Sequence, residues 1–198
     1  MFTVYYTLIG IVAFFIAALI LGTWLRAHRT KADAEKSSRV MHFFFFAGLV
    51  APPLIAIFYP GLTRFDALLG LPSLPFKPFF LALGILLAIP GLYSLGVTNK
   101  LLRSLGSGTN AFILTKKIVD DDIYKRTRNP MSLGFYLFAL ALGFVSNSTF
   151  VLLAVSLGLI PAHAFFLKYF EEVELELRFG ESYLEYKKTV PFLIPRFK

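Results

Sequence analysis

Long stretches without a charged residue constrain this chain more than any other feature of its sequence. The run from Val4 to Leu25 has about the 20 residues that a helix needs to cross the hydrocarbon core of a bilayer. Similar runs extend from Met41 to Tyr59, interrupted by Pro52-Pro53, and from Phe79 to Val97, interrupted by Pro90-Gly91. Each run predicts a membrane-spanning helix. A signal peptide is the alternative for the first, but no positive charge precedes it.

The longest uncharged run, from Leu133 to Leu167, is too long for one crossing. The polar tetrapeptide Ser146-Asn147-Ser148-Thr149 divides it and favours a turn. We therefore expect two tightly connected spans, with a buried hairpin of short helices as the alternative. The hydrophobic share of 57% also exceeds that of ordinary soluble domains. The expected fold is all-α, a polytopic membrane bundle of about five spans within one domain, residues 1–198.

The basic residues indicate how such a bundle would be oriented. Of 20 Lys and Arg, five lie in Arg26–Val40, seven in Thr98–Ser132 and six from Lys168 onward, leaving only Arg64 and Lys77 elsewhere. With five spans, these 18 share one face, which the positive-inside rule assigns to the cytoplasm. We expect the N-terminus outside and the C-terminus inside. The net charge of +8 then reflects topology and contact with anionic lipid, and it predicts no nucleic-acid partner.

Two segments of the long connection at 98–132 are candidates for ligand binding. Gly106 and Gly108 allow a close backbone approach to a ligand, although a flexible turn is the simpler interpretation. In Arg128-Asn129-Pro130, the proline suits the first turn of the fourth span, whose N-terminus offers free amides. Arg128 adds a bidentate partner for a carboxylate or phosphate. The alternative for this segment is a membrane boundary that contacts lipid phosphate.

Paired carboxylates form the third candidate, where the fifth span emerges. Glu171 and Glu172 lie about 100° apart on a helix, so one of them can face a site. The alternative is a solvated acidic face in which Glu174 and Glu176 pair with Lys168 and Arg178. The helix is expected to end at Gly180, followed by a second short helix over 181–188.

Metal and thiol chemistry find little support in the sequence. There is no cysteine, and the three histidines (His28, His42 and His163) are scattered, so no metal site is expected. His163 lies within the last span, where ionisable groups are costly and often functional. Its alternative role is a hydrogen bond to a neighbouring helix or to backbone freed by Pro161.

Together, the segments from residue 105 to 198 resemble the isoprenylcysteine carboxyl methyltransferase and phospholipid methyltransferase superfamily of integral-membrane enzymes. The resemblance runs through Gly106-Ser107-Gly108-Thr109, Lys117-Ile118-Val119, Tyr124, Arg128-Asn129-Pro130-Met131, Gly134, Glu171-Glu172, Phe179-Gly180-Glu181-Ser182-Tyr183, Tyr186 and Val190-Pro191-Phe192-Leu193-Ile194-Pro195. Residues 1–97 match only as hydrophobic spans. Asp122 and Phe192 replace a usual Gly and a usual Arg, and Asn129 and Ser132 stand where many members have His and Tyr.

The resemblance implies an S-adenosylmethionine-dependent methyltransferase, whose cofactor site is formed by the 98–132 connection and the C-terminal helices on the cytoplasmic side. The implied cofactor-binding residues are Gly106, Gly108, Lys117, Val119, Tyr124, Arg128, Asn129, Pro130 and Glu171. If the methyl acceptor is an amine, it must lose a proton, and we expect Glu172 or a bound water to accept that proton. The acceptor itself would be a lipid-like or prenylated molecule or peptide that enters from the bilayer.

Three other interpretations remain open. One is a phospholipid amine N-methyltransferase of the same superfamily. Another is a nicotinamide enzyme similar to the membrane sterol reductases, which share a related helical core. The third is a non-enzymatic scaffold or transporter, which the interrupted helices at Pro52-Pro53 and Pro90-Gly91 favour. The sequence sets no oligomeric state.

Overall fold

The computed structural model describes residues 1–59, 61–105 and 115–196, and its regular structure in these ranges is entirely helical. The helices are α1 (Phe2–Ala27), α2 (Lys31–Phe45), α3 (Ala51–Phe58), α4 (Phe65–Leu69), α5 (Lys77–Ser104), α6 (Pro130–Val145), α7 (Thr149–Leu153), α8 (Ile160–Phe166), α9 (Glu172–Phe179) and α10 (Glu181–Thr189). Short 3₁₀ segments are η2 (Leu62–Arg64) and η3 (Asp122–Lys125), and π segments are η1 (Phe46–Val50), η4 (Ala154–Leu159) and η5 (Leu167–Glu171).

The predicted spans all form helices, which confirms the helical membrane bundle. Four continuous described helices are long and apolar enough to cross a membrane: Phe2–Ala27, Lys31–Phe58, Lys77–Ser104 and Thr149–Phe179. The fifth apolar helix, Pro130–Val145, is shorter. As predicted, the polar turn at 146–148 separates α6 from α7, and Gly180 ends α9 with a positive φ of 59°.

The second long helix extends well beyond its uncharged run. The second helix begins at Lys31 rather than near Met41, because the Thr30 hydroxyl accepts a hydrogen bond from the Asp33 amide and caps it. It also passes through Pro52-Pro53 without stopping. The π segment η1 precedes the prolines, and this wider turn accommodates the backbone around residues that lack an amide proton.

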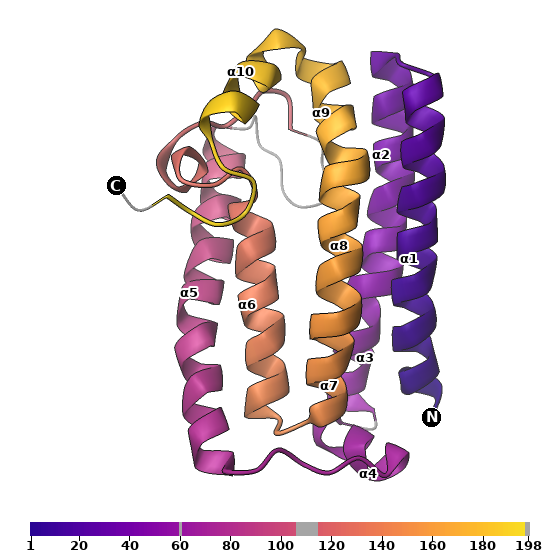
Figure 1. Ribbon diagram of the computed structural model, residues 1–198, viewed down its shortest axis with the longest axis vertical. Helices are drawn as coiled ribbons and strands as arrows, with labels where there is room; N and C mark the ends of the chain where they lie inside the picture. The colour runs from indigo at the N-terminus through magenta and orange to yellow at the C-terminus, as the bar shows by residue number, and fades with distance from the viewer. Residues whose placement is uncertain (60, 106–114, 197–198) are drawn as a thin grey trace.

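The chain folds into antiparallel helices that run along the long axis of the bundle (Figure 1). The junction of α1 with α2, the start of α6 and the helix α10 lie at one end, which we call the basic end. The N-terminus, α4 and the α6–α7 turn lie at the other end, which we call the far end. The helices α5 and α6 form a hairpin beside α7–α9. The three basic segments predicted to share one face thus include the α1–α2 junction, the end of α5 with the start of α6, and the end of α9 with α10, all toward the basic end.

Glycines bring two pairs of helices into backbone contact. A Cβ on Gly10 of α1 would lie 2.4 Å from the carbonyl oxygen of Gly48, and one on Gly91 of α5 would lie 2.9 Å from the amide nitrogen of Phe138 in α6. Close packing of this kind drives helix association in membranes, where burial of apolar surface contributes little.

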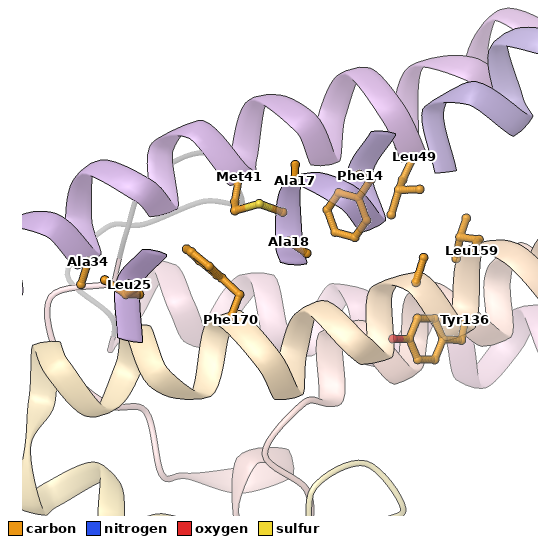
Figure 2. Packing of buried hydrophobic residues seen from close by; sticks show 11 residues of the cluster. Phe14, Ala17, Ala18, Leu25, Ala34, Met41, Leu49, Tyr136, Leu159 and Phe170 are labelled. Carbon is orange, nitrogen blue, oxygen red and sulfur yellow. The ribbon is translucent and has the colours of Figure 1, made fainter. Parts of the chain in front are cut away.

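The main core lies between α1, α2 and the helix formed by α7–α9 (Figure 2). Phe14, Met41 and Phe170 are fully buried there, each from a different one of these three elements. Figure 2 shows Met41 and Phe170 directed into the same space. This packing fixes the face of α8–α9 that carries the candidate carboxylates.

Candidate functional site

Two adjoining cavities lie toward the basic end of the bundle. The first, about 200 Å³, is the polar chamber, lined by Leu102, Thr115, Lys117, Ile118, Val119, Tyr124, Arg128, Asn129, Pro130, Met131, Ser132, Glu171, Leu175, Phe179, Tyr183 and Tyr186. The second, about 210 Å³, is the deep chamber, lined by Ser38, Met41, His42, Phe45, Leu102, Thr115, Met131, Ser132, Phe135, His163, Phe166, Leu167, Phe170, Glu171, Glu174, Leu175 and Arg178. Shared lining residues, including Glu171, make the two chambers neighbours.

The polar chamber brings together most of the residues expected to bind the cofactor. Lys117, Val119, Tyr124, Arg128, Asn129, Pro130 and Glu171 all line it. Gly106 and Gly108 lie outside the described residues. Glu172, the expected proton acceptor, lines neither chamber.

Arg128 has an unsatisfied donor at this chamber. Its side chain is only 7% exposed, and its Nη1 lies 3.2 Å from Glu172 Oε1 and 3.5 Å from the Tyr183 hydroxyl. Its Nε is buried and has no hydrogen-bond partner among the described residues. Since a buried donor without a partner costs about 1–3 kcal/mol, this atom indicates a place for an acceptor group.

The N-terminus of α6 adds further donors beside Arg128. Asn129 precedes the helix, and Leu133 donates the first helical bond to the Asn129 carbonyl at 3.0 Å. The amides of Met131 and Ser132 come before that bond, and both residues line the polar chamber. A helix start of this kind favours an anionic group.

The adjacent carboxylates have opposite environments. Glu172 is buried, and its oxygens contact Arg128, Lys168 at 2.8 Å and Lys187 at 2.7 Å. Glu171 makes no hydrogen bond or ion pair with any described residue, and it lines both chambers. Glu172 is therefore held by cations, whereas Glu171 is available to a ligand.

The segment after α10 holds the Arg-Asn-Pro segment in place through hydrogen bonds. The Arg128 amide donates to the Pro191 carbonyl at 2.9 Å, and the Asn129 side-chain amide donates to the Phe192 carbonyl at 2.9 Å. The Phe192 ring also covers the Lys168 ammonium, 4.1 Å from the ring centre. The Asn129 amide group is thus committed to this contact. The sequence patterns did not reveal it, because it joins segments about 60 residues apart.

Tyrosines form much of the remaining wall of the polar chamber. Tyr124 and Tyr186 meet where the Tyr186 hydroxyl donates to the Tyr124 carbonyl at 2.7 Å, and Tyr183 is almost fully buried. Burial raises the pKa of all three phenols well above its usual range, so they remain neutral. Tyr183 and Tyr186 lie in the segments that resemble the superfamily, and the resemblance implies no role for them.

The deep chamber has polar groups at both ends. At the basic end, Glu174 and Arg178 form a pair at 2.6 Å that is buried, whereas the alternative interpretation of this run expected a solvated face; Arg178 also donates to the Thr115 carbonyl. At the opposite end, the Tyr136 hydroxyl of α6 lies 2.9 Å from His163 Nδ1. This is the hydrogen bond to a neighbouring helix that was one of the two roles expected for His163.

The fold and the site define an integral-membrane helical protein with a polar chamber at one end of its bundle. A family model described as phospholipid methyltransferase matches residues 78–182, more than half of the chain. The chain therefore belongs to the phospholipid methyltransferase family, which confirms the superfamily resemblance. Searches of curated proteins and of solved structures find no match.

The matched region contains α5 except for Lys77, the whole of α6, Arg128 and both carboxylates. The family is one of methyltransferases, so methyl transfer is its chemistry. Its description favours a phospholipid acceptor over a prenylated cysteine.

Proposed function

We propose that the protein transfers a methyl group from S-adenosylmethionine, bound in the polar chamber, to a lipid-like acceptor in the deep chamber. The observation that carries this proposal is the pair of unsatisfied groups at the chamber wall. Arg128 Nε is a buried donor without a partner, and Glu171 is a carboxyl group that makes no hydrogen bond or ion pair with a described residue. A guanidinium donor and a carboxyl group with open hydrogen-bonding positions suit a zwitterionic ligand.

The residues present fit the chemistry of S-adenosylmethionine. Its carboxylate matches Arg128 and the first amides of α6, and its ammonium or ribose hydroxyls match Glu171. The tyrosine faces suit its sulfonium, since aromatic rings attract cations. When bound, this cofactor supplies an electrophilic methyl group whose departure leaves an electron pair on sulfur.

Glu172 acts in this proposal as a positioning residue. It holds Arg128 Nη1 while Nε has no described partner, and it ties Lys168 and Lys187 to the same carboxylate. With both oxygens engaged by cations, Glu172 is poorly suited to accept a proton. Glu171 takes that role instead, because it lines both the chamber of the cofactor and the chamber of the acceptor.

Whether the reaction needs a proton acceptor depends on the chemistry of the methyl acceptor. A protonated amine must lose a proton before its nitrogen can attack. Glu171 can receive it, since the other carboxylate of the deep chamber, Glu174, is paired with Arg178. A carboxylate acceptor needs no base, and positioning and exclusion of water then account for the catalysis. The basic end faces the cytoplasm in this proposal, which places the cofactor where it is made.

Product analysis with isotopically labelled S-adenosylmethionine tests the proposal. Membranes containing the wild type, Glu171→Gln or Glu185→Gln are incubated with the labelled compound, and the lipids and lipidated peptides are examined by mass spectrometry. Glu185 is exposed on α10 and lines neither chamber, so it is a matched control. We expect label in a lipid product of the wild type and the control, and much less with Glu171→Gln. No labelled product from folded wild type would contradict methyl transfer.

A further inference from the structure

The deep chamber has a polar part toward the basic end and an apolar part further in. Apart from His163, its polar lining residues on each helix lie nearer the basic end than its aromatic ones. The polar residues are Ser38 and His42 of α2, Ser132 of α6, and Glu171, Glu174 and Arg178 of the last long helix. The aromatic residues are Phe45, Phe135, Phe166 and Phe170. A ligand with a polar headgroup and an apolar tail matches this division.

Two adjacent serines of α2 differ in whether their hydroxyls have partners. Ser37 is 2% exposed, and its hydroxyl donates to the carbonyls of Asp33 at 2.7 Å and Ala34 at 3.2 Å. Ser38 is 6% exposed and lines the deep chamber, yet its hydroxyl makes no hydrogen bond with any described residue. A serine within a helix commonly bonds to a carbonyl of the preceding turn. The Ser38 hydroxyl is therefore a buried donor that is open to a ligand.

Arg178 and His42 border the same polar part. The two terminal nitrogens of Arg178 bond to Glu174 and to the Thr115 carbonyl, while its Nε makes no hydrogen bond with any described residue. His42 lies one turn after Ser38 on the same face of α2, and its imidazole interacts electrostatically with Arg178. One ring nitrogen of His42 bonds to the Ser38 backbone, which leaves the other for a ligand. A hydroxyl, a guanidinium N–H and an imidazole nitrogen are thus available together, which suits an anion with several oxygens.

The spacing between these groups and Glu171 matches that of a phosphoethanolamine group. Glu174, to which the Arg178 guanidinium bonds, lies three residues from Glu171, about 4.5 Å along the helix axis. The nitrogen and phosphorus of phosphoethanolamine are four bonds apart, which is about 5 Å at about 1.2 Å per bond. A phosphate beside Arg178 therefore leaves the amine beside Glu171, where the deep chamber meets the polar chamber.

We infer that Ser38, His42 and Arg178 bind the phosphate of a phospholipid acceptor whose amine lies beside Glu171. This inference rests on the proposed function and assigns the residues that recognise its acceptor. The open nitrogen of His42 donates to the phosphate when the imidazole is protonated, a form that a neighbouring anion favours. The acyl chains begin in the apolar part, beside Phe45.

This assignment places headgroup recognition in a part of the chain that the family match does not include. The match covers residues 78–182, whereas Ser38 and His42 belong to α2. Arg178, on α9, lies within the match. Ser38 and His42 are thus specificity-determining residues of this chain, contributed by its N-terminal half to a chamber whose other walls come from the matched region.

Two short-chain lipids that differ only in their linker test the inference. One is dihexanoyl phosphatidylethanolamine, and the other has the same acyl chains and aminoethyl group but a neutral carbamate in place of the phosphodiester. Their binding to protein in nanodiscs is measured by calorimetry against empty nanodiscs, and their methylation by labelled S-adenosylmethionine is measured separately. Ser38→Ala removes the hydroxyl, and Ser38→Thr keeps it. Ser37→Ala is the matched control, because Ser37 lines neither chamber.

The ratio of the two dissociation constants is the diagnostic quantity, since it cancels differences in membrane partition between variants. We expect wild type to bind the phosphodiester lipid at least about 30-fold more tightly than the carbamate lipid. Ser38→Ala should lower this ratio about tenfold, and Ser38→Thr should restore most of it. Ser37→Ala should keep the wild-type ratio. S-adenosylmethionine binding, which should be the same in all four proteins, reports whether each is folded.

Inorganic phosphate, titrated alone, separates a lipid headgroup from a free anion. We expect it to bind at least about tenfold more weakly than the phosphodiester lipid, which also places its amine and acyl chains. Tighter binding of inorganic phosphate would assign the site to a free anion and overturn the inference.

An unchanged ratio in Ser38→Ala would also overturn the inference, while methyl transfer stood. If the ratios change as expected and neither lipid is methylated, the proposed function fails and the phosphate assignment holds. The two failures are thus distinguishable.

Discussion

The two ends of the bundle differ in whether their buried polar groups have hydrogen-bond partners within the chain. At the far end, Asp66 is 5% exposed, and its carboxylate accepts hydrogen bonds from the amides of Thr149 at 2.9 Å and Phe150 at 2.7 Å. The adjacent cavity is small, about 50 Å³, with mostly apolar walls. At the basic end, two cavities of about 200 Å³ each meet at Glu171, and Arg128 Nε has no partner.

In our proposal, this difference separates polar groups that stabilise the fold from polar groups that bind a ligand. Asp66 is satisfied by the chain itself, because it caps the N-terminus of α7. Arg128 and Glu171 are left unsatisfied by the chain, although the wall around them is held by Glu172 and by the segment after α10. Substitutions at the far end should therefore change stability, and substitutions at the basic end should change ligand binding.

Replacing Arg128 should have the largest effect on binding. We expect Arg128→Ala to weaken S-adenosylmethionine affinity about 100-fold, because a charge-assisted bond and its geometry are lost. Arg126→Ala, two residues away with an exposed side chain, is the matched control and should bind as the wild type does. Calorimetric titration of the cofactor measures both. Equal losses in the two variants would indicate a general charge effect and contradict the assignment.

Replacing Asp66 should have the largest effect on stability. Asp66→Ala removes the acceptor of two buried amides, so we expect the free energy of unfolding to fall by about 2–3 kcal/mol. Cofactor affinity should stay within about twofold of wild type for the fraction that remains folded. Asp120→Ala, on an exposed side chain, should change neither quantity. Thermal unfolding in detergent checks the prediction, and an unaltered midpoint would refute it.

The adjacent carboxylates should respond differently to the same change. Glu171→Gln replaces a carboxyl group that makes no described hydrogen bond or ion pair, so stability should hold or rise slightly while cofactor affinity falls about tenfold. Glu172→Gln weakens contacts to three cations, so the free energy of unfolding should fall by about 1–2 kcal/mol. Unfolding and titration of both variants make the comparison. A loss of stability in Glu171→Gln together with a loss of cofactor affinity in Glu172→Gln would contradict the roles assigned to the two residues.

Glu171 and Glu172 also show which features of the site can be predicted from the sequence and which cannot. Hydrophobic runs, the turn at 146–148 and Gly180 predict the helices well, because these signals are local. Which of two adjacent carboxylates faces the site depends on the rotation of the helix. The π segments η4 and η5 shift that rotation, and no local pattern predicts them. The contacts of Asn129 with Phe192, and of Tyr136 with His163, likewise depend on packing between distant segments.

Alkaline pH should weaken the basic end. Burial by itself lowers the pKa of Lys187, but the hydrogen bonds with Glu172 and Glu176 raise it by more. The pKa of Lys187 is therefore above its usual value. Burial raises the pKa of Tyr124, Tyr183 and Tyr186. Since all four folded-state pKa values are raised, the stability is fully present below the unfolded values of about 10 and is lost as pH rises through the folded values.

Unfolding measured between pH 8 and pH 11.5 tests this sign. We expect a flat region to about pH 9.5 and a steady fall above about pH 10. Lys187→Met should reduce the stability at pH 8 and make the alkaline fall shallower. Stability that increases above pH 10 would contradict the assigned directions.

The smallest expected effect is at Asp122, which replaces the glycine usual in the superfamily. Asp122 has a φ of 49°, in the left-handed region that favours glycine. We expect Asp122→Gly to raise the free energy of unfolding by about 0.5 kcal/mol. Asp120→Gly, whose backbone does not adopt a positive φ, should lower it or leave it unchanged. A loss of stability at position 122 comparable with that at 120 would disprove the explanation.

The central claim is that unsatisfied polar groups at the basic end bind S-adenosylmethionine, while the satisfied far end only stabilises the fold. Its most direct test is the unfolding free energy of wild type, Arg128→Ala and Asp66→Ala with and without a fixed, saturating concentration of the cofactor. At about 1,000 times the wild-type Kd, we expect a gain of about 4 kcal/mol in wild type and in Asp66→Ala. At the same concentration, Arg128→Ala should gain about 1.4 kcal/mol. No gain in wild type, or the same gain in all three proteins, would contradict the account.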